Sequence, residues 1–583
     1  MAQAQVGPYL KPGKSAPYSL NSGLDLERVL NNWVLQRGAL TVAVQGFLAA
    51  CSDLVTSCAA PHHHPSRERR IAVILSLVDA GLASLASEEA ALHRASTSLK
   101  VARNQSKVLS PIRMLPPEIL ADIFLMAHRR SSSYDEFKYY LELNRMSPAQ
   151  AIAETSSYWR QVAISTPSLW TDVRINAGQI WYGNAVSSLN RTNGAPIHLT
   201  IFEPDGENTD IHWSWESLHK PSKFFRQACQ QIHGLHIYSR AYANDTTEIV
   251  LKHWLDHCSA GVTKVLRIQR PEAVLSLDTP PPLDWDFDLE STEHAEAVLT
   301  SISVLQLEST LIPWASTAYH NLADLRLYYE CAQPNRVQIS ASEFANILNS
   351  SPRLVRLQLE NLDITSSDDW VSTTMIRPVH LEVLYLCEMS RESYQHLLSL
   401  VSLSDCLNDL SVSLRIRQSD EVADLIQGFF RNVRIKTLIC SGIDEHPDSQ
   451  YWAWSLSAMV ASLSNLVLNE LPLYETEVQA IIGERQTSPD QDTPHGQIAP
   501  CLPHLFMRYC DVNIEGLKLI VSAYGVENLH LDRCLVDNAE ISGSYLKGMG
   551  ELRSQLLDVF PNLVCVVSNG GATAEWPWVK RFD

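Results

Sequence analysis

One six-residue pattern recurs through most of the chain and constrains its fold more than any other feature. Each copy carries apolar residues at its first, fourth and sixth positions, as in Leu322–Leu327 and Leu354–Leu359. Weaker copies begin earlier, at Trp170, Ile232 and Thr263. Successive clear copies are 20 to 39 residues apart, which leaves room for one strand and one helix in each unit. The fourth-position residues of the clear copies are Leu305, Leu325, Leu357, Leu384, Leu410, Leu438, Leu466, Leu505, Leu529 and Leu563.

The alternating end of each copy predicts a short strand with one buried face, because side chains alternate along a strand. The segments between copies, such as Ser342–Leu348 and Glu421–Phe430, are typical of helices. No unit can bury its apolar face alone, so the units must stack. The pattern resembles leucine-rich repeats, and this resemblance implies an irregular solenoid over residues 173–583, a horseshoe of parallel strands and helices. An ordinary α/β domain with many strands is the alternative.

Two short segments precede the repeats. Ser110–Phe124 reads SPIRMLPPEILADIF, and Tyr158–Trp170 reads YWRQVAISTPSLW. The paired prolines of the first segment are compatible with the first turn of a helix, where a missing N–H group costs nothing. The apolar residues that follow them form one stripe of a short helix, and the second segment offers a matching apolar surface. An amphipathic helix packed in its own core is the alternative interpretation.

Followed by repeats, these two segments resemble the F-box of fungal F-box proteins that carry a leucine-rich-repeat-like domain. The resemblance implies a non-enzymatic substrate-recognition subunit of an SCF-type ubiquitin ligase. In such a complex the F-box binds the Skp adaptor, the adaptor binds a cullin, and the repeats bind an unidentified protein target. The adaptor contacts that it implies are Leu115, Pro116, Pro117, Glu118, Ile119, Leu120, Ile123, Phe124, Trp159, Val162, Leu169 and Trp170.

The chain departs from the F-box pattern in two places. A long insert, residues 127–150, separates the two segments, and Glu154–Ser157 is polar where the family pattern is apolar or carries cysteine. These departures keep open a second function, in which a leucine-rich repeat scaffold with a relic F-box binds proteins without any link to ubiquitination.

Apolar residues at seven-residue spacing occupy the N-terminal part of the chain. They predict two long helices that fold back on each other as a coiled-coil-like hairpin over residues 21–106, with residues 1–20 as a mobile tail. An F-box at 110–172 and the repeats then complete the expected organisation. The two series are Leu26, Trp33, Leu40, Phe47 and Leu54, and Ile71, Val78, Leu85, Leu92 and Leu99.

Polar strand positions that alternate with the repeat leucines are expected on the concave face of a solenoid. They include Arg326, Gln358, Tyr385, Ser411 and His530. Arg326, Tyr385 and the neighbouring Tyr328 combine aromatic and cationic groups, a composition enriched at interface hot spots, and are the candidate target-binding residues. Solvated strand residues are the alternative, with the acidic loop at 278–292 or residues 576–578 as other binding surfaces.

Charge and motif content narrow the function further. The net charge is −19, and residues 1–110 carry 11 Lys and Arg against 7 Asp and Glu, so the acidic excess lies in the remainder. An acidic surface repels phosphate backbones, so nucleic acid is not an expected partner. We find no nucleotide-binding, serine-hydrolase or zinc-protease motif, and expect no catalytic site, metal or cofactor.

No leader and no apolar stretch of about 20 residues is apparent, so we expect no membrane association. The 12 cysteines are scattered, which is typical of a reducing compartment. These features predict a cytoplasmic and/or nuclear protein.

Overall fold

The chain forms two compact units, residues 1–109 and 110–583, in a computed structural model. The predicted tail at 1–20, nearly all of the acidic loop at 278–292 and residues 576–578 lie outside the described residues. The structure describes residues 23–59, 66–105, 111–132, 147–176, 182–202, 223–239, 244–270, 291–329, 337–366, 375–403, 406, 409–415, 420–430, 433–442, 463–471, 479, 502–536 and 545–568.

The first unit contains two long helices, α1 (Gly23–Ala59) and α2 (Ser66–Gln105). Contrary to the sequence-based expectation, α1 contains a segment, Glu27–Thr56, that is long and apolar enough to cross a membrane by length and composition. None of its residues in the most apolar window is buried. Polar residues near its start, such as Glu27 and Arg28, interrupt the apolar pattern of this segment. Length and composition alone do not separate a membrane span from a helix that packs against another protein surface.

The second unit begins with a helical module, residues 111–170. Its elements are η1 (Pro111–Met114), α3 (Pro117–Ser132), α5 (Pro148–Thr155), α6 (Ser157–Ile164) and η2 (Pro167–Leu169). Prolines open α3, α5 and η2, as expected for residues without an N–H group. Ser147 and Ser156 cap α5 and α6 by accepting hydrogen bonds from backbone N–H groups. The predicted insert at 127–150 is helical at both of its ends, and residues 133–146 lie outside the described part.

The predicted α/β class with a parallel sheet is confirmed. In the described part of the chain, fourteen strands form one sheet in the order β1-β2-β3-β4-β5-β6-β8-β10-β11-β12-β13-β14-β16-β18, and every neighbouring pair is parallel. The strands are β1 (Asp172–Asn176), β2 (Ile197–Phe202), β3 (Ile232–Tyr238), β4 (Val265–Gln269), β5 (Val304–Glu308), β6 (Asp324–Tyr328), β8 (Arg356–Glu360), β10 (Val383–Cys387), β11 (Leu410–Arg415), β12 (Ile435–Ser441), β13 (Asn465–Asn469), β14 (His504–Arg508), β16 (Asn528–Asp532) and β18 (Val564–Ser568).

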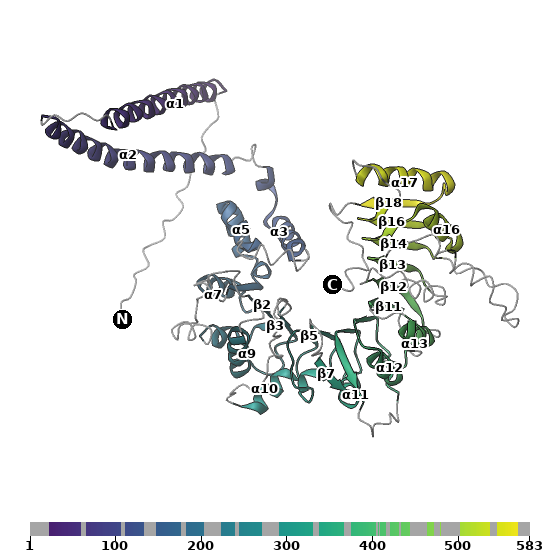
Figure 1. Ribbon diagram of the computed structural model, residues 1–583. Helices are drawn as coiled ribbons and strands as arrows, with labels where there is room; N and C mark the ends of the chain where they lie inside the picture. The colour runs from purple at the N-terminus through teal and green to yellow at the C-terminus, as the bar shows by residue number, and fades with distance from the viewer. Residues whose placement is uncertain are drawn as a thin grey trace. The chain divides into compact units, whose positions relative to one another are not determined.

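Helices lie along one face of this sheet (Figure 1). The core between the two layers is continuous, from Val173 to Cys565. We call the opposite face of the sheet the open face. The helices are α7 (Tyr182–Arg191), α9 (Asn244–His257), α10 (Thr292–Leu299), α11 (Ala341–Ser350), α12 (Arg391–Leu400), α13 (Asp420–Phe430), α16 (Ile514–Tyr524) and α17 (Tyr545–Val559), with the short helix η4 (Thr317–Tyr319). Outside the main sheet, four short strands form two parallel pairs, β7 (Val337–Ser340) with β9 (Leu362–Thr365) and β15 (Asp511–Val512) with β17 (Leu535–Val536).

The register stacks the fourth-position residues of the repeated pattern into one row across the sheet. Two of the predicted positions are wrong, because Val412 and Cys565 occupy this row in place of Leu410 and Leu563. The alternating pattern permits either frame, since residues two apart share a face. The β2 strand was not among the predicted copies, because Pro196 stands at the first position of its copy. The row is Val173, Leu199, Leu235, Leu266, Leu305, Leu325, Leu357, Leu384, Val412, Leu438, Leu466, Leu505, Leu529 and Cys565.

A left-handed residue directly follows several strands. Its φ lies between 49° and 57°, a conformation that residues other than glycine rarely adopt. The N–H groups of five such residues continue the ladder, as in the bond from Tyr509 N to Asp532 O at 3.0 Å; the five are Ser309, Asn361, Glu388, Glu470 and Tyr509. This bond offsets the strain and turns the chain away from the sheet, so these side chains form a rim at the carboxyl ends of the strands. The rim positions with this conformation are Ser309, Asn361, Glu388, Glu470, Tyr509 and Arg533.

Candidate functional site

The predicted adaptor contacts separate into two groups in the helical module. At the start of α3, Pro116, Pro117, Glu118 and Ile119 are exposed, and 48% of the Ile119 surface is accessible. Three more of the predicted contacts, Leu115, Ile123 and Trp159, are half-buried. The remaining five are buried, and they are Leu120, Phe124, Val162, Leu169 and Trp170.

The five buried residues form the core of the module. Phe124 packs against Trp159 with 4.9 Å between the ring centroids, and the Trp170 indole donates to the Ala163 carbonyl oxygen at 2.7 Å. Their predicted role as direct adaptor contacts therefore needs revision, because a buried side chain offers no surface to a partner. A core and an interface require apolar residues at the same helical spacing, so the sequence pattern could not separate the two roles.

The exposed apolar surface of α3 instead follows its outer side. Ile119 and Met126 are exposed and seven residues apart, and the half-buried Ile123 lies between them. Met114, the last residue of η1, is also exposed. We call Met114, Ile119, Ile123 and Met126 the α3 outer surface. Neither methionine was among the predicted contacts, although the seven-residue spacing from Ile119 to Met126 indicates the second.

One hydrogen bond holds this surface in place. The Tyr158 hydroxyl of α6 donates to the Leu115 carbonyl oxygen at 2.9 Å. It joins the start of α3 to α6, although the two residues are far apart in sequence. A rigidly held apolar surface loses less conformational entropy on binding than a mobile one.

The predicted target-binding residues do not form a free patch on the open face. Arg326 is only 8% exposed, and its Nε atom donates to Asp324 Oδ1 at 3.1 Å. The other Asp324 oxygen lies 3.6 Å from Arg356, so the three charges form one ion-paired group. Arg326 therefore has little surface for a partner, and its predicted binding role is not supported by its surroundings.

Tyr385 and Tyr328 are half-buried. The polar side chains of Tyr385 and Cys387 neighbour the Glu360 carboxyl. Burial raises the pKa of this carboxyl to about 7, and these two neighbours only partly oppose the shift. Burial likewise raises the pKa of Tyr385. This cluster is a polar network within the sheet rather than an exposed patch.

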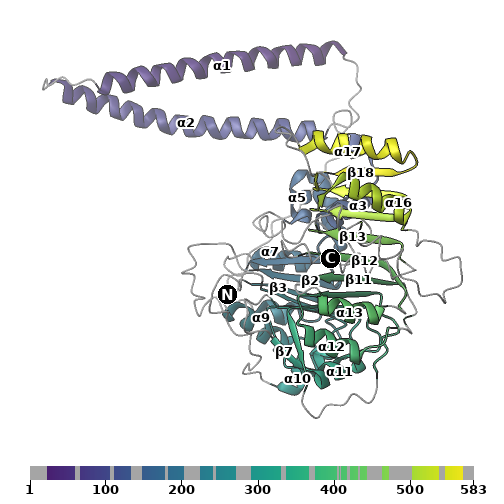
Figure 2. The same ribbon diagram turned by 45° about the vertical axis from the view of Figure 1, so that its right-hand side comes forward.

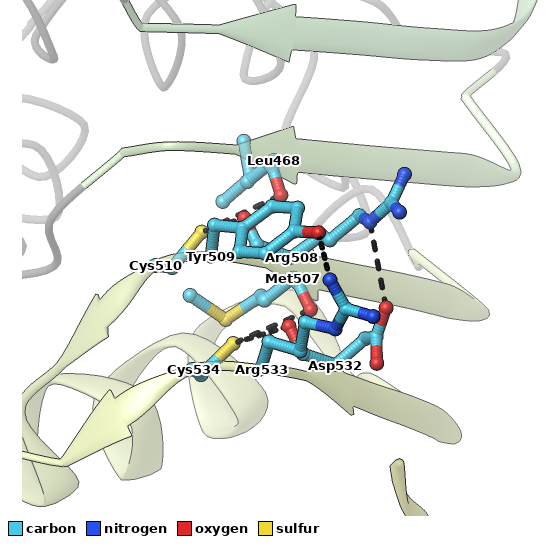
Figure 3. A network of polar contacts seen from close by, with 8 residues as sticks. All are labelled: Leu468, Met507, Arg508, Tyr509, Cys510, Asp532, Arg533 and Cys534. Carbon is cyan, nitrogen blue, oxygen red and sulfur yellow. Dashed lines mark hydrogen bonds and ion pairs between the residues drawn. The ribbon is translucent and has the colours of Figure 1, made fainter. Parts of the chain in front are cut away.

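A different aromatic and cationic cluster lies on the rim. Figure 3 shows Tyr509 beside two guanidinium groups. The Cζ atoms of Arg508 and Arg533 lie 4.9 and 5.4 Å from the centre of the Tyr509 ring, and Arg533 donates to its hydroxyl. Asp532, which is 1% exposed, holds Arg508 through an ion pair at 3.4 Å. Tyr509 and Arg533 are both exposed, and we call Arg508, Tyr509 and Arg533 the cationic rim cluster.

The position of this cluster follows from the backbone. Tyr509 and Arg533 are the left-handed residues after β14 and β16, so neighbouring units place them side by side. One residue further on, the buried thiols of Cys510 and Cys534 donate to the carbonyl oxygens of Leu468 and Met507 at 3.4 and 3.3 Å (Figure 3). The sequence contained no signal for the cluster, because the repeat pattern does not show where the left-handed turn falls.

The cationic rim cluster differs from the predicted target-binding residues Arg326, Tyr328 and Tyr385 in the charge of Arg533. Among the residues that the structure describes, no carboxylate lies within ion-pairing distance of Arg533, whereas Arg326 and Arg508 are both paired. Exposed arginine and tyrosine together are typical of binding hot spots. Within the described part of the chain, no group of His, Cys, Asp and Glu could hold a metal ion.

Comparison with known proteins adds no assignment. The chain matches no protein-family model and no curated protein. A functional assignment therefore depends on the fold and on the surfaces described above.

Proposed function

We propose that this protein is the substrate-recognition subunit of an SCF-type ubiquitin ligase. Its helical module would act as an F-box and bind the Skp adaptor, through which a cullin joins the complex. Its stacked strand and helix units would act as a leucine-rich-repeat-like domain and bind a protein target in the cytoplasm and/or nucleus. The proposal includes no catalytic step and no cofactor.

The observation that carries the proposal is the division of the LPPEILADIF segment between two roles. Leu120 and Phe124 form the core with α6 and η2, and the same helix leaves Ile119 and Met126 exposed on its outer side. Exposed apolar residues that share one side of a helix form a surface that a partner can cover. The α3 outer surface is therefore the part of the module on which we place the adaptor.

The rim at the carboxyl ends of the strands supports the proposed binding of a target protein. The described sheet spans fourteen parallel strands and gives a long row of turns that are open to variation. Among the described residues, the cationic rim cluster is an exposed aromatic and cationic group on this row. On a chain with an excess of acidic residues, it supports a target segment that carries carboxylates.

Affinity capture from cells tests both arms together. The intact chain should recover the Skp adaptor, a cullin and at least one further protein, and the half-life of that protein should lengthen when the chain is removed. Ile119→Asp should lose adaptor and cullin but keep the target, whereas Tyr509→Ala with Arg533→Ala should lose the target but keep the adaptor. Recovery of neither adaptor nor cullin by the intact, folded chain would reject the ligase assignment.

One contact favours the second candidate, a repeat scaffold with a relic F-box. The Arg191 guanidinium at the end of α7 lies 4.3 Å from the Trp170 ring centre, so the module packs onto the first unit of the sheet. Stacked repeat proteins need a terminal cap for their apolar first unit, and the module fulfils that requirement. In that case the chain would bind partners, while half-lives across the proteome would not change on its removal.

A further inference from the structure

The N-terminal hairpin leaves its inner seam open. Figure 2 shows α1 and α2 close together near their connection and apart at their other ends. Seam residues at the open end remain substantially exposed, with 41% of Trp33 and 51% of Leu99 accessible. Between the helices at this end is a groove of about 480 Å³, which Trp33, Leu40, Leu92 and Leu99 line with apolar surface.

The remaining lining of this groove combines three basic residues with Gln36, Ala95 and Ser96. Arg37, Lys100 and Arg103 contribute cationic groups, and the Arg37 guanidinium lies 5.6 Å from the centre of the Trp33 ring. None of the residues that line the groove is acidic. An apolar floor whose charged lining residues are all cationic favours an occupant with one apolar side and a negatively charged side.

The length of the groove indicates the form of that occupant. Its lining on α2 runs from Leu92 to Arg103, which at a rise of about 1.5 Å per residue is about 17 Å. About three helical turns would fit along it. Two helices bury only a narrow seam, and a third helix placed between them would cover the four large apolar residues that line the groove.

We propose that the groove between α1 and α2 binds an acidic amphipathic helix of a partner protein. The charge of the hairpin argues against a second copy, because residues 1–110 carry 11 basic against 7 acidic residues and like charges would meet. This inference does not depend on the ubiquitin ligase proposal.

Fluorescence anisotropy of a labelled helical peptide of three heptads, titrated with the full chain, measures binding to the groove. The peptide carries leucine at the a and d positions, glutamate on one flank and alanine elsewhere. We expect saturable binding that weakens with salt, and loss of affinity of roughly tenfold or more in Leu92→Ser with Leu99→Ser and in Arg37→Glu with Lys100→Glu. The matched control is Leu35→Ser with Val42→Ser, which removes exposed apolar side chains of α1 that do not line the groove.

Three further arms make the test decisive. A peptide with lysine in place of glutamate should not bind, and circular dichroism should show the same helix content in every variant. Phosphatidylserine vesicles should not replace the peptide. No binding of the glutamate peptide, equal binding of both peptides, loss of binding in the control variant, or binding to the vesicles alone would each overturn the proposal.

Discussion

Glu360 is expected to make stability depend on pH. Its carboxyl is 7% exposed on β8, and burial raises its pKa from 4.5 to about 7. In the unfolded chain it ionises near pH 4.5, so between about pH 4.5 and 7 the folded state holds a proton that the unfolded state has lost. Stability is therefore complete below pH 4.5 and falls as the pH rises through 7. A shift of about 2.5 pKa units corresponds to about 3 kcal/mol.

Glu360→Gln should remove this loss, because an amide has nearly the same shape and cannot ionise. We expect the variant to unfold at a higher urea concentration than the wild type at pH 8, by up to about 3 kcal/mol in free energy, and to differ little at pH 4.5. The assay is urea unfolding followed by circular dichroism across this pH range. A variant that is less stable than the wild type at pH 8 would show that Glu360 is ionised and usefully paired in the folded protein, and would refute the reasoning.

Two further predictions concern packing. Leu120→Ala should destabilise the protein by about 2–5 kcal/mol because it leaves a cavity in the module core, whereas Ile119→Ala should cost less than about 1 kcal/mol, and thermal unfolding compares them. Equal costs would contradict the division of α3 into a core side and an outer side. Gly442→Ala should destabilise by about 1–3 kcal/mol, because an added Cβ would lie 2.6 Å from the Glu470 carbonyl oxygen, and unchanged urea unfolding would count against this close approach.

The strands were largely predictable from sequence because each one repeats the same burial requirement. The frame within a strand was less certain. Leu410 and Val412 lie on the same face, and only pairing with β10 decides which of them joins the row of Leu384. The β2 strand was not predicted, because the pattern requires an apolar side chain such as leucine at its first position and Pro196 occupies that position in the β2 copy.

The candidate site was less predictable for a physical reason. Leu120 and Ile119 are adjacent and equally apolar, and only the position of α6 decides that one is core and the other surface. Arg326 follows the strand alternation as expected, but its ion pair with Asp324 removes it from the surface. The cationic rim cluster depends on the left-handed conformation of Tyr509 and Arg533, and no residue type in the six-residue pattern predicts that conformation.

Calorimetric titration of the purified Skp adaptor into the full chain tests the central claim most directly. The wild type should bind, and Ile119→Asp should lose about 2 kcal/mol or more of binding free energy while remaining folded, since aspartate in the first turn of α3 suits the helix dipole. Met375→Asp, which changes an exposed apolar residue outside the module, should bind as the wild type does. Adaptor binding that is absent in the wild type, or unchanged in Ile119→Asp, would contradict the account.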